Sequence, residues 1–223
     1  MSNGSTLIGQ PPISGAACRL SRRTALGLAA GSVALAAGPA RAADAGLVSA
    51  IRGQATATRA GVTLDLHPGA VVQVGDSLRT HEGARLELTL IDESTVSLGE
   101  LSQLVLTIAI IRPETDGSFV FDLLDGIARA VLGPQLRDVF EVRGRVAVAA
   151  ARSTDFIVET TSRQTDVFVQ AGAVAVAQVY GSGDVVLEPG EGVDVLRGQR
   201  LLMVKSWGQA RIDDVLARTS VSG

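Results

Sequence analysis

Aromatic residues are scarce in this sequence, and positive charge is not in excess. Five Phe, one Trp and one Tyr account for 3% of the 223 residues, and the formal net charge is −3. Single-stranded nucleic acids are held largely by stacking on aromatic side chains, and sugar-binding platforms usually use them too, so both kinds of ligand are disfavoured. A general nucleic-acid-binding protein also carries a basic stripe. We therefore expect no nucleic-acid partner.

Cysteine and histidine are almost missing as well. Cys18 is the only cysteine and lies in an N-terminal segment that we expect to be removed, so the mature chain would hold no thiol. This excludes disulfides, thiolate metal sites and cysteine nucleophiles. His67 and His81 each precede a turn sequence. The alternative to plain turn histidines is a zinc site shared with carboxylates, which needs several ligands close together. We predict neither a metal nor a cofactor.

Residues 1–42 have the composition of an export signal. Arg22 and Arg23 precede an uncharged run rich in Ala and Gly, and Ala40-Arg41-Ala42 is a small-residue cleavage pattern. A charged region, an apolar region and small residues at the end are the three parts of such a signal. The stretch around Arg22 and Arg23 resembles the twin-arginine export motif, although the aromatic residue usual in that motif is absent. We predict export by this route and cleavage after Ala42.

Other interpretations of this segment are weaker. The run from Thr24 to Ala40 is only mildly apolar and is shorter than a membrane span, which needs about 20 residues. An amphipathic helix of the folded domain is a second alternative. Lipidation of Cys18 is a third, but neither a basic residue nor an apolar run precedes this cysteine. We expect a periplasmic protein without an integral membrane span after cleavage.

The mature chain reads as a series of β-strands. Leu86, Leu88 and Leu90 alternate with polar residues, and Val96 and Leu98 resume the alternation after a turn. Such alternation buries one face of a strand and exposes the other, as in antiparallel hairpins. Strands about every 8–12 residues with Gly and Pro between them favour a sandwich or barrel. We predict an all-β fold, an antiparallel β-sandwich or jelly-roll-like domain of many short hairpins.

The C-terminal end has a different periodicity. Ile212, Val215 and Leu216 are spaced as on one face of a helix between Gln209 and Arg218. We therefore predict three parts: an export signal over residues 1–42, a β domain over residues 43–205, and one short C-terminal helix with its tail over residues 206–223.

No catalytic constellation stands out. Asp76 follows Gly75 in a turn, and Ser153-Thr154-Asp155 lacks a G-x-S-x-G pattern and a placed histidine. A hydrolase that uses Ser153, Asp76 and His81 is the enzymatic alternative. Calcium held by side chains from separate turns is another, but no spaced calcium loop supports it. We predict no catalytic residues and no enzyme activity. The candidate calcium ligands are Asp122, Asp125 and Glu191.

A set of motifs follows in a fixed order along the mature chain. In this order and spacing, from about residue 48 to residue 195, they resemble a FecR-type domain. We assign structural roles to the family-motif residues Gly75, Asp76, Asp92, Thr154, Phe156 and Gly190. The motifs are Val74-Gly75-Asp76-Ser77-Leu78-Arg79-Thr80, Asp92-x-Ser94-x-Val96-x-Leu98, Ala151-Arg152-Ser153-Thr154-Asp155-Phe156 and Leu187-x-Pro189-Gly190-x-Gly192.

The resemblance implies a periplasmic, β-rich sensory domain. The name-giving members of the family relay a signal from an outer-membrane iron-siderophore transporter to a cytoplasmic sigma factor. They carry a cytoplasmic domain and a membrane helix, for which residues 1–42 leave no room, so we carry over only the extracytoplasmic domain. We expect a protein partner such as a membrane sensor, a transporter or a regulator. The alternative function is a cell-wall or glycan-binding β domain.

Two positions depart from the family pattern. Asp92-Glu93 stands where the family usually has Asp-Gly. Glutamate in a left-handed conformation costs about 1 kcal/mol or more, so we predict a looser loop of three or more residues there. Ser153 stands where the family often has glycine, and we expect a shallower bend because serine lacks the conformational freedom of glycine.

Overall fold

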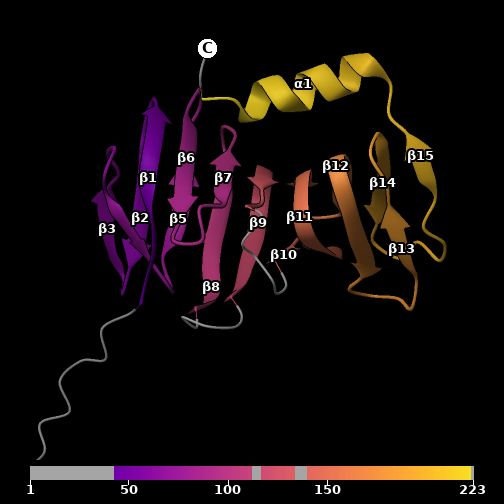
Figure 1. Cartoon of the computed structure of the whole chain (residues 1–223), viewed down its shortest axis with the longest axis horizontal. Coiled ribbons are helices and arrows are strands. Elements are labelled where there is room, and N and C mark those ends of the chain that lie inside the picture. The colour runs from indigo at the N-terminus through magenta and orange to yellow at the C-terminus, as the bar shows by residue number, and fades with distance from the viewer. Residues whose placement is uncertain (1–42, 112–116, 134–139, 222–223) are drawn as a thin grey trace, which may run out of the picture. The chain divides into compact units, whose positions relative to one another are not determined.

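The computed structural model describes residues 43–111, 117–133 and 140–221. The predicted export signal, with Arg22, Arg23, Ala40 and Ala42, lies outside these residues. The described residues form fifteen strands and one C-terminal helix (Figure 1), which confirms the predicted all-β class. Pairing is antiparallel throughout except between β9 and β10, which run parallel. No helix in these three ranges is long and apolar enough to cross a membrane.

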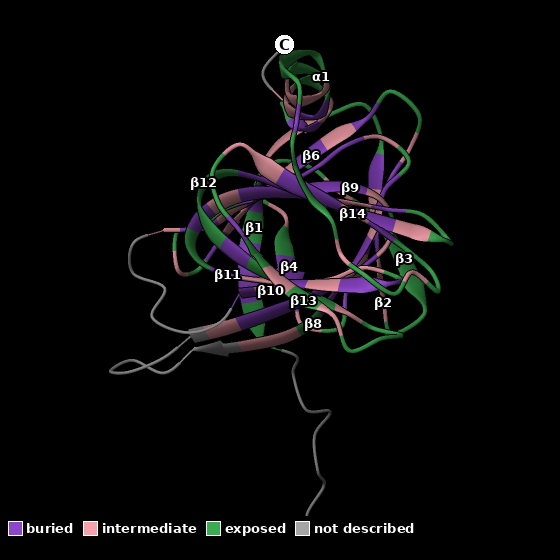
Figure 2. Ribbon diagram, turned by 90° about the vertical axis from the view of Figure 1, so that its right-hand side faces the viewer, coloured by how far each residue is buried: buried purple, intermediate pink, exposed green. Residues whose placement is uncertain are grey.

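The fifteen strands form one continuous sheet, whose pairings divide into two sets that enclose one main core (Figure 2). We call the first set the helix-side sheet because α1 lies against it. We call the second the opposite sheet. The helix-side sheet contains, in spatial order, β4 (Val71–Gln73), β1 (Asp44–Arg52), β6 (Arg85–Leu90), β7 (Thr95–Leu98), the second halves of β9 (Gly117–Val131) and β11 (Ala147–Thr160), the first half of β12 (Gln164–Gln178), β14 (Glu191–Leu196) and β15 (Val204–Ser206).

The opposite sheet takes the remaining strands and the other halves of the three long ones. Its edge strands are β3 and β13, each paired on one side within the described residues. In spatial order it contains β3 (Val62–Asp65), β2 (Ala55–Arg59), β5 (Ser77–Thr80), β8 (Gln103–Ile111), the first half of β9, β10 (Phe140–Arg143), the first half of β11, the second half of β12, and β13 (Asp184–Leu187).

Three long strands pass through both sheets, beside the many short strands that the sequence predicted. β9, β11 and β12 have 15, 14 and 15 residues. They bend at Gly126, at Ser153 and at Gly172, where φ is +88°, +47° and +84°. A Cβ at Gly126 would collide with the Ser102 side chain, so both the conformation and the close approach require glycine there. Asp125-Gly126 is a sequence typical of a turn, yet β9 continues through it.

Ser153 takes the left-handed conformation that glycine would adopt. Its φ is +47°, and the register between β11 and β12 shifts between Arg152 and Asp155. Position 153 is therefore left-handed although it carries serine where the family often has glycine. The neighbouring Thr154 hydroxyl lies 2.6 Å from the Arg152 carbonyl oxygen and 3.1 Å from that of Ala173, so it stabilises the bend.

The loop between β6 and β7 has the predicted length, but its Glu93 has an unexpected left-handed conformation. Four residues, Ile91 to Ser94, separate the two strands, as expected for a loop of three or more. Glu93 nevertheless has φ of +68°. Asp92 offsets this strain, because its carboxylate accepts hydrogen bonds from the Ser94 amide at 3.1 Å and the Ser94 hydroxyl at 2.7 Å.

The main core is built largely from Leu, Val and Ala, with one group of aromatic rings. Phe119, Phe121, Phe140 and Phe156 are all buried, and their neighbouring ring centroids lie 5.3–6.3 Å apart. Offset or tilted aromatic rings at this separation stabilise a fold beyond the free energy gained by burying their apolar surface. The aromatic residues are few, but four of the five phenylalanines meet here, where β9, β10 and β11 are neighbours.

A second, smaller core holds α1 (Gln209–Thr219) on the outer face of the helix-side sheet. The helix confirms the predicted periodicity, because Ile212, Val215 and Leu216 pack in this core. The Trp207 ring stacks on Phe168 with centroids 4.9 Å apart. The other members are Ile127 and Ile157, which point outward from β9 and β11. Arg218 extends this attachment with an ion pair of 2.5 Å to Glu159.

Candidate interaction surface

The described residues contain no cluster suited to metal binding. No three or more His, Cys, Asp or Glu side chains come together in this part of the chain. Asp122, Asp125 and Glu191 therefore do not form the calcium site considered from the sequence. His67 Nδ1 lies 3.0 Å from the carbonyl oxygen of Pro68, as in a local turn contact. The zinc alternative has no support in this geometry.

The Ser153-Thr154-Asp155 stretch is engaged in structural contacts. The Thr154 hydroxyl is directed at main-chain carbonyls, and Asp155 forms a bidentate ion pair with Arg129 at 2.9 and 2.6 Å. The hydrogen bond to Asp155 raises the pKa of the Arg129 guanidinium further above its ordinary value. A nucleophile needs an adjacent base, and no histidine contacts these residues within the described chain.

Asp76 is a buried structural acid with more partners than the sequence suggested. Its side chain is 0% exposed. The carboxylate accepts hydrogen bonds from the Gln73 amide at 2.8 Å and from the Arg59 Nε and Nη2 atoms at 2.8 and 2.7 Å. The first of these is a contact within the turn, to the residue three positions before Asp76. The ion pair with Arg59, which reaches from β2, was not predicted, because no local pattern links residues 17 positions apart.

Three further motif residues lie at structural positions. Phe156 is fully buried and meets Phe140 edge-on at 85°. Gly190 has φ of +85° in the turn before β14, and its amide donates to the Val169 carbonyl at 2.8 Å. Gly75 also has positive φ, +91°, directly before Asp76. Each of these three residues therefore lies in the core or in a turn of the fold.

The exposed surface around β15 is apolar, and we call it the C-terminal edge surface. Leu201 is 76% exposed and Met203 62% exposed, and Tyr180, Leu196 and Val204 are also exposed. The loop after β14 is held against the turn after β12 because Gln178 Nε2 donates to the Gln199 carbonyl at 2.9 Å. Large side chains exposed together in this way mark a contact surface more often than isolated ones do.

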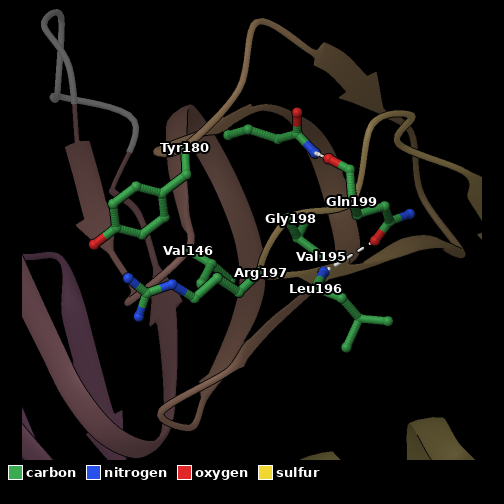
Figure 3. A pocket seen from close by; sticks show the side chains of 8 residues that line it. Val146, Tyr180, Val195, Leu196, Arg197, Gly198 and Gln199 are labelled. Atoms are coloured by element: carbon green, nitrogen blue, oxygen red, sulfur yellow. Dashed lines mark hydrogen bonds between the residues drawn. The ribbon is translucent and has the colours of Figure 1, made fainter.

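A small hollow lies within this surface (Figure 3). Tyr180, Leu196 and Arg197 line it, and Arg197 Cζ lies 4.8 Å from the centre of the Tyr180 ring. Its volume of about 10 Å³ would hold no more than a single water. Ligand pockets are typically about 300–1,000 Å³. This hollow is therefore too small to hold a ligand, whereas a wider and more open one beside it, of about 720 Å³, shares Leu196 and Arg197.

Basic residues accompany these apolar side chains. Arg197, Arg200, Lys205 and Arg211 follow one another in a stretch, Val195 to Ile212, that contains no acidic residue. The whole chain, by contrast, has a net charge of −3. Sequence reasoning missed this surface. The available signal was the run Leu201-Leu202-Met203-Val204, which is apolar but has no alternation to identify an inward face.

The base of α1 holds a partly buried charged cluster. Arg211 Nη2 lies 3.1 Å from Asp166 Oδ2 and 2.9 Å from Asp194 Oδ1, and the Gln164 amide donates to Asp166 at 2.7 Å. Burial raises the pKa of Asp166 to about 6, and the nearby Asp194 and Glu159 carboxylates add to this, while Gln164 and Arg211 oppose it. The attachment of α1 therefore includes an acid that titrates near neutral pH.

Replacement of Asp166 by asparagine is expected to remove a pH-dependent part of the stability. The folded pKa of about 6 lies above the value of about 4 for aspartate in an unfolded chain, so the folded state binds the proton more tightly. This group therefore contributes stability below about pH 4, which is lost as the pH rises through about 6. We expect the native-minus-variant difference in unfolding free energy to fall by about 1–3 kcal/mol over this window in urea denaturation.

A matched substitution controls for general charge effects. Asp184→Asn removes an exposed aspartate at the start of β13. The expected result is a pH-dependent difference for Asp166→Asn that is clearly steeper than that for Asp184→Asn. Equal slopes for the two variants would contradict the assignment of this titration to Asp166.

Comparison with known proteins finds one matching family model and two similar folds. Residues 76–175 match the family model described as FecR protein. Two crystal structures at 2.50 and 1.65 Å, each of a chain provisionally described as an anti-sigma factor from Parabacteroides distasonis ATCC 8503, are similar with TM-scores of 0.53 and 0.52. Both are 19% identical over 63% of this chain. The matched part spans 63% and 64% of the solved chains. No curated protein matches significantly.

Proposed function

We propose that this chain, whose residues 76–175 form a FecR-type domain, is a non-enzymatic interaction module of a periplasmic signal-transduction system. The module is exported through the twin-arginine route and cleaved after Ala42. It binds a partner protein at the C-terminal edge surface. The partner is a membrane sensor, a transporter or a regulator of the envelope.

One observation carries the proposal: the C-terminal edge surface joins an edge strand to exposed apolar side chains. β15 pairs with β14 and with no other strand in the described residues, and all three of its residues are exposed. The free side of an edge strand presents backbone donors and acceptors that an extended segment of another protein can pair with. Leu201 and Met203 would then be buried by that segment.

The positive charge of the C-terminal edge surface indicates the charge of its partner. Arg197 and Arg200 have no carboxylate partner within the described residues, whereas Lys205 is paired with Asp194 at 3.5 Å. Complementary charges guide an encounter and fix its orientation. We therefore expect the partner segment to be extended, acidic and partly apolar. The FecR match and the anti-sigma description of the two similar folds favour a signalling partner.

Two aspartates at the C-terminal edge surface are expected to abolish signalling. The double variant Leu201→Asp and Met203→Asp places like charges against an acidic partner and removes the apolar contact. Its matched control is Val62→Asp with Leu64→Asp, which changes exposed residues on β3, an edge strand of the opposite sheet. The measurement is the transcript profile of a deletion strain of the native host that is complemented with each variant.

The control variant is expected to restore the wild-type profile, and the double variant to leave the deletion profile unchanged. Immunoblots of the periplasmic fraction and thermal melts must show equal amounts and equal melting temperatures for both proteins. Restoration by the double variant would place the partner elsewhere. A deletion without any effect on transcription would contradict the signalling role itself.

A further inference from the structure

A polar hollow lies on the outer face of the opposite sheet, at the end away from β13. It crosses four neighbouring strands, β3, β2, β5 and β8, and has a volume of about 460 Å³. Every residue that lines it is polar. This volume is within the range of about 300–1,000 Å³ usual for ligand sites. The hollow therefore differs from the small one at the C-terminal edge surface.

The strand register arranges the lining side chains in rows. Asp65, Thr56, Arg79 and Gln103 are direct cross-strand partners in one row, on β3, β2, β5 and β8. Neighbouring strands lie about 4.7–4.9 Å apart, so the row extends about 14 Å. Short hydroxyl side chains at Thr56 and Ser77 lie between the longer ones, which makes the surface concave.

The row offers many hydrogen-bond groups and one unpaired cation. The Arg79 side chain is exposed and forms no hydrogen bond or ion pair with any described residue. Gln103 is only weakly engaged, with one contact of 3.2 Å to the Ser77 hydroxyl. Hydroxyl and amide groups both donate and accept hydrogen bonds, whereas a guanidinium only donates and matches the two oxygens of a carboxylate. A ligand that fits needs many hydroxyls and a carboxylate.

We propose that this hollow binds a carboxylate-bearing oligosaccharide. The guanidinium of Arg79 holds the carboxylate, and the threonine and glutamine side chains along the row bond the sugar hydroxyls. An apolar ligand would leave the polar groups of this lining without hydrogen-bond partners. A polyphosphate is disfavoured because Asp65 stands at the far end of the same row and repels a dense negative charge. Because the hollow and the C-terminal edge surface lie on different strands, this inference does not depend on the proposed function.

The test is a titration of the mature chain with sugars, followed by amide NMR shifts. The probes are a linear trimer of galacturonic acid, the uncharged maltotriose, and the galacturonic acid monomer. The acidic trimer is expected to shift resonances of β2, β3, β5 and β8. Its affinity should be modest, because no aromatic ring lines the hollow. Maltotriose lacks the charge and the monomer lacks the length, so each should bind at least about tenfold more weakly than the acidic trimer.

Two arginine variants separate this hollow from general charge attraction. Arg79→Gln is expected to weaken binding of the acidic trimer about tenfold or more. Arg152→Gln is the matched control, because Arg152 is also exposed on the outer face of the opposite sheet but in a hollow lined mainly by alanines. It should leave binding unchanged. The proposal is overturned if the trimer shifts no resonance of the four strands, if both variants bind alike, or if monomer and trimer bind equally.

Discussion

Replacement of both Arg22 and Arg23 by lysine is expected to stop export of the protein almost completely. The twin-arginine route is identified by the arginine pair, and lysine keeps the charge without the guanidinium. The protein should then accumulate inside the cell with its leader attached. Cell fractionation and immunoblotting measure this, and intact mass gives the length of each form. The wild-type protein is expected in the periplasm with Ala43 as its first residue.

A control variant distinguishes the motif from general positive charge. Arg19→Lys changes a basic residue of the same segment outside the pair and should leave export unchanged. Export of the double variant at the wild-type level would show that the leader follows the general secretory route. Retention of the leader on the periplasmic protein would show that the segment serves as an anchor and is not cleaved after Ala42.

Replacement of Asp76 by alanine is expected to destabilise the β domain by about 3 kcal/mol or more. The Gln73 amide would lose its acceptor in a buried position, and Arg59 would lose its bidentate partner. Removal of one member of a buried pair typically costs about 3–5 kcal/mol. Because the Arg59 side chain is 33% exposed and can be hydrated, the lower end applies. Urea denaturation at neutral pH measures the change in unfolding free energy.

Two further variants assign this loss to its cause. Asp76→Asn keeps a hydrogen-bond acceptor of the same shape without the charge, so it should cost less than the alanine variant. Asp65→Ala removes an exposed aspartate from β3 and should change stability by less than about 0.5 kcal/mol. An alanine variant at position 76 that is as stable as the Asp65 variant would contradict the structural role of Asp76.

Stretches in which apolar residues recur with a clear period predicted the correct strands and the correct helix. The alternation of Leu86, Leu88 and Leu90 predicted β6, and the structure buries these three side chains. The apolar stretch from Gln103 to Ile111 is typical of a central strand, and β8 has these bounds and pairs with β5 and β9. Ile212, Val215 and Leu216 predicted α1. In each case the spacing of apolar residues in the sequence reveals which face of the helix or strand is buried.

Features that depend on distant contacts could not be predicted. Gly126 resembles a turn glycine, and only its approach to Ser102 shows why β9 bends there and continues. The Arg59–Asp76 ion pair joins two strands through tertiary structure. The packing of Trp207 on Phe168 explains the position of α1, yet neither residue has a local signal for the other. Leu201 and Met203 are exposed, but they belong to an apolar run of the kind usually found in a core. The sequence alone therefore gives no reason to place them at the surface.

The central claim is that the C-terminal edge surface contacts a partner protein in the periplasm. Site-specific photocrosslinking in living cells tests it most directly, with the photoreactive amino acid at Met203 or at Val62, which are 62% and 59% exposed. We predict one abundant crosslinked envelope protein from position 203 and none of that protein from position 62. Absence of a crosslink at position 203, or the same product from both positions, would contradict the account.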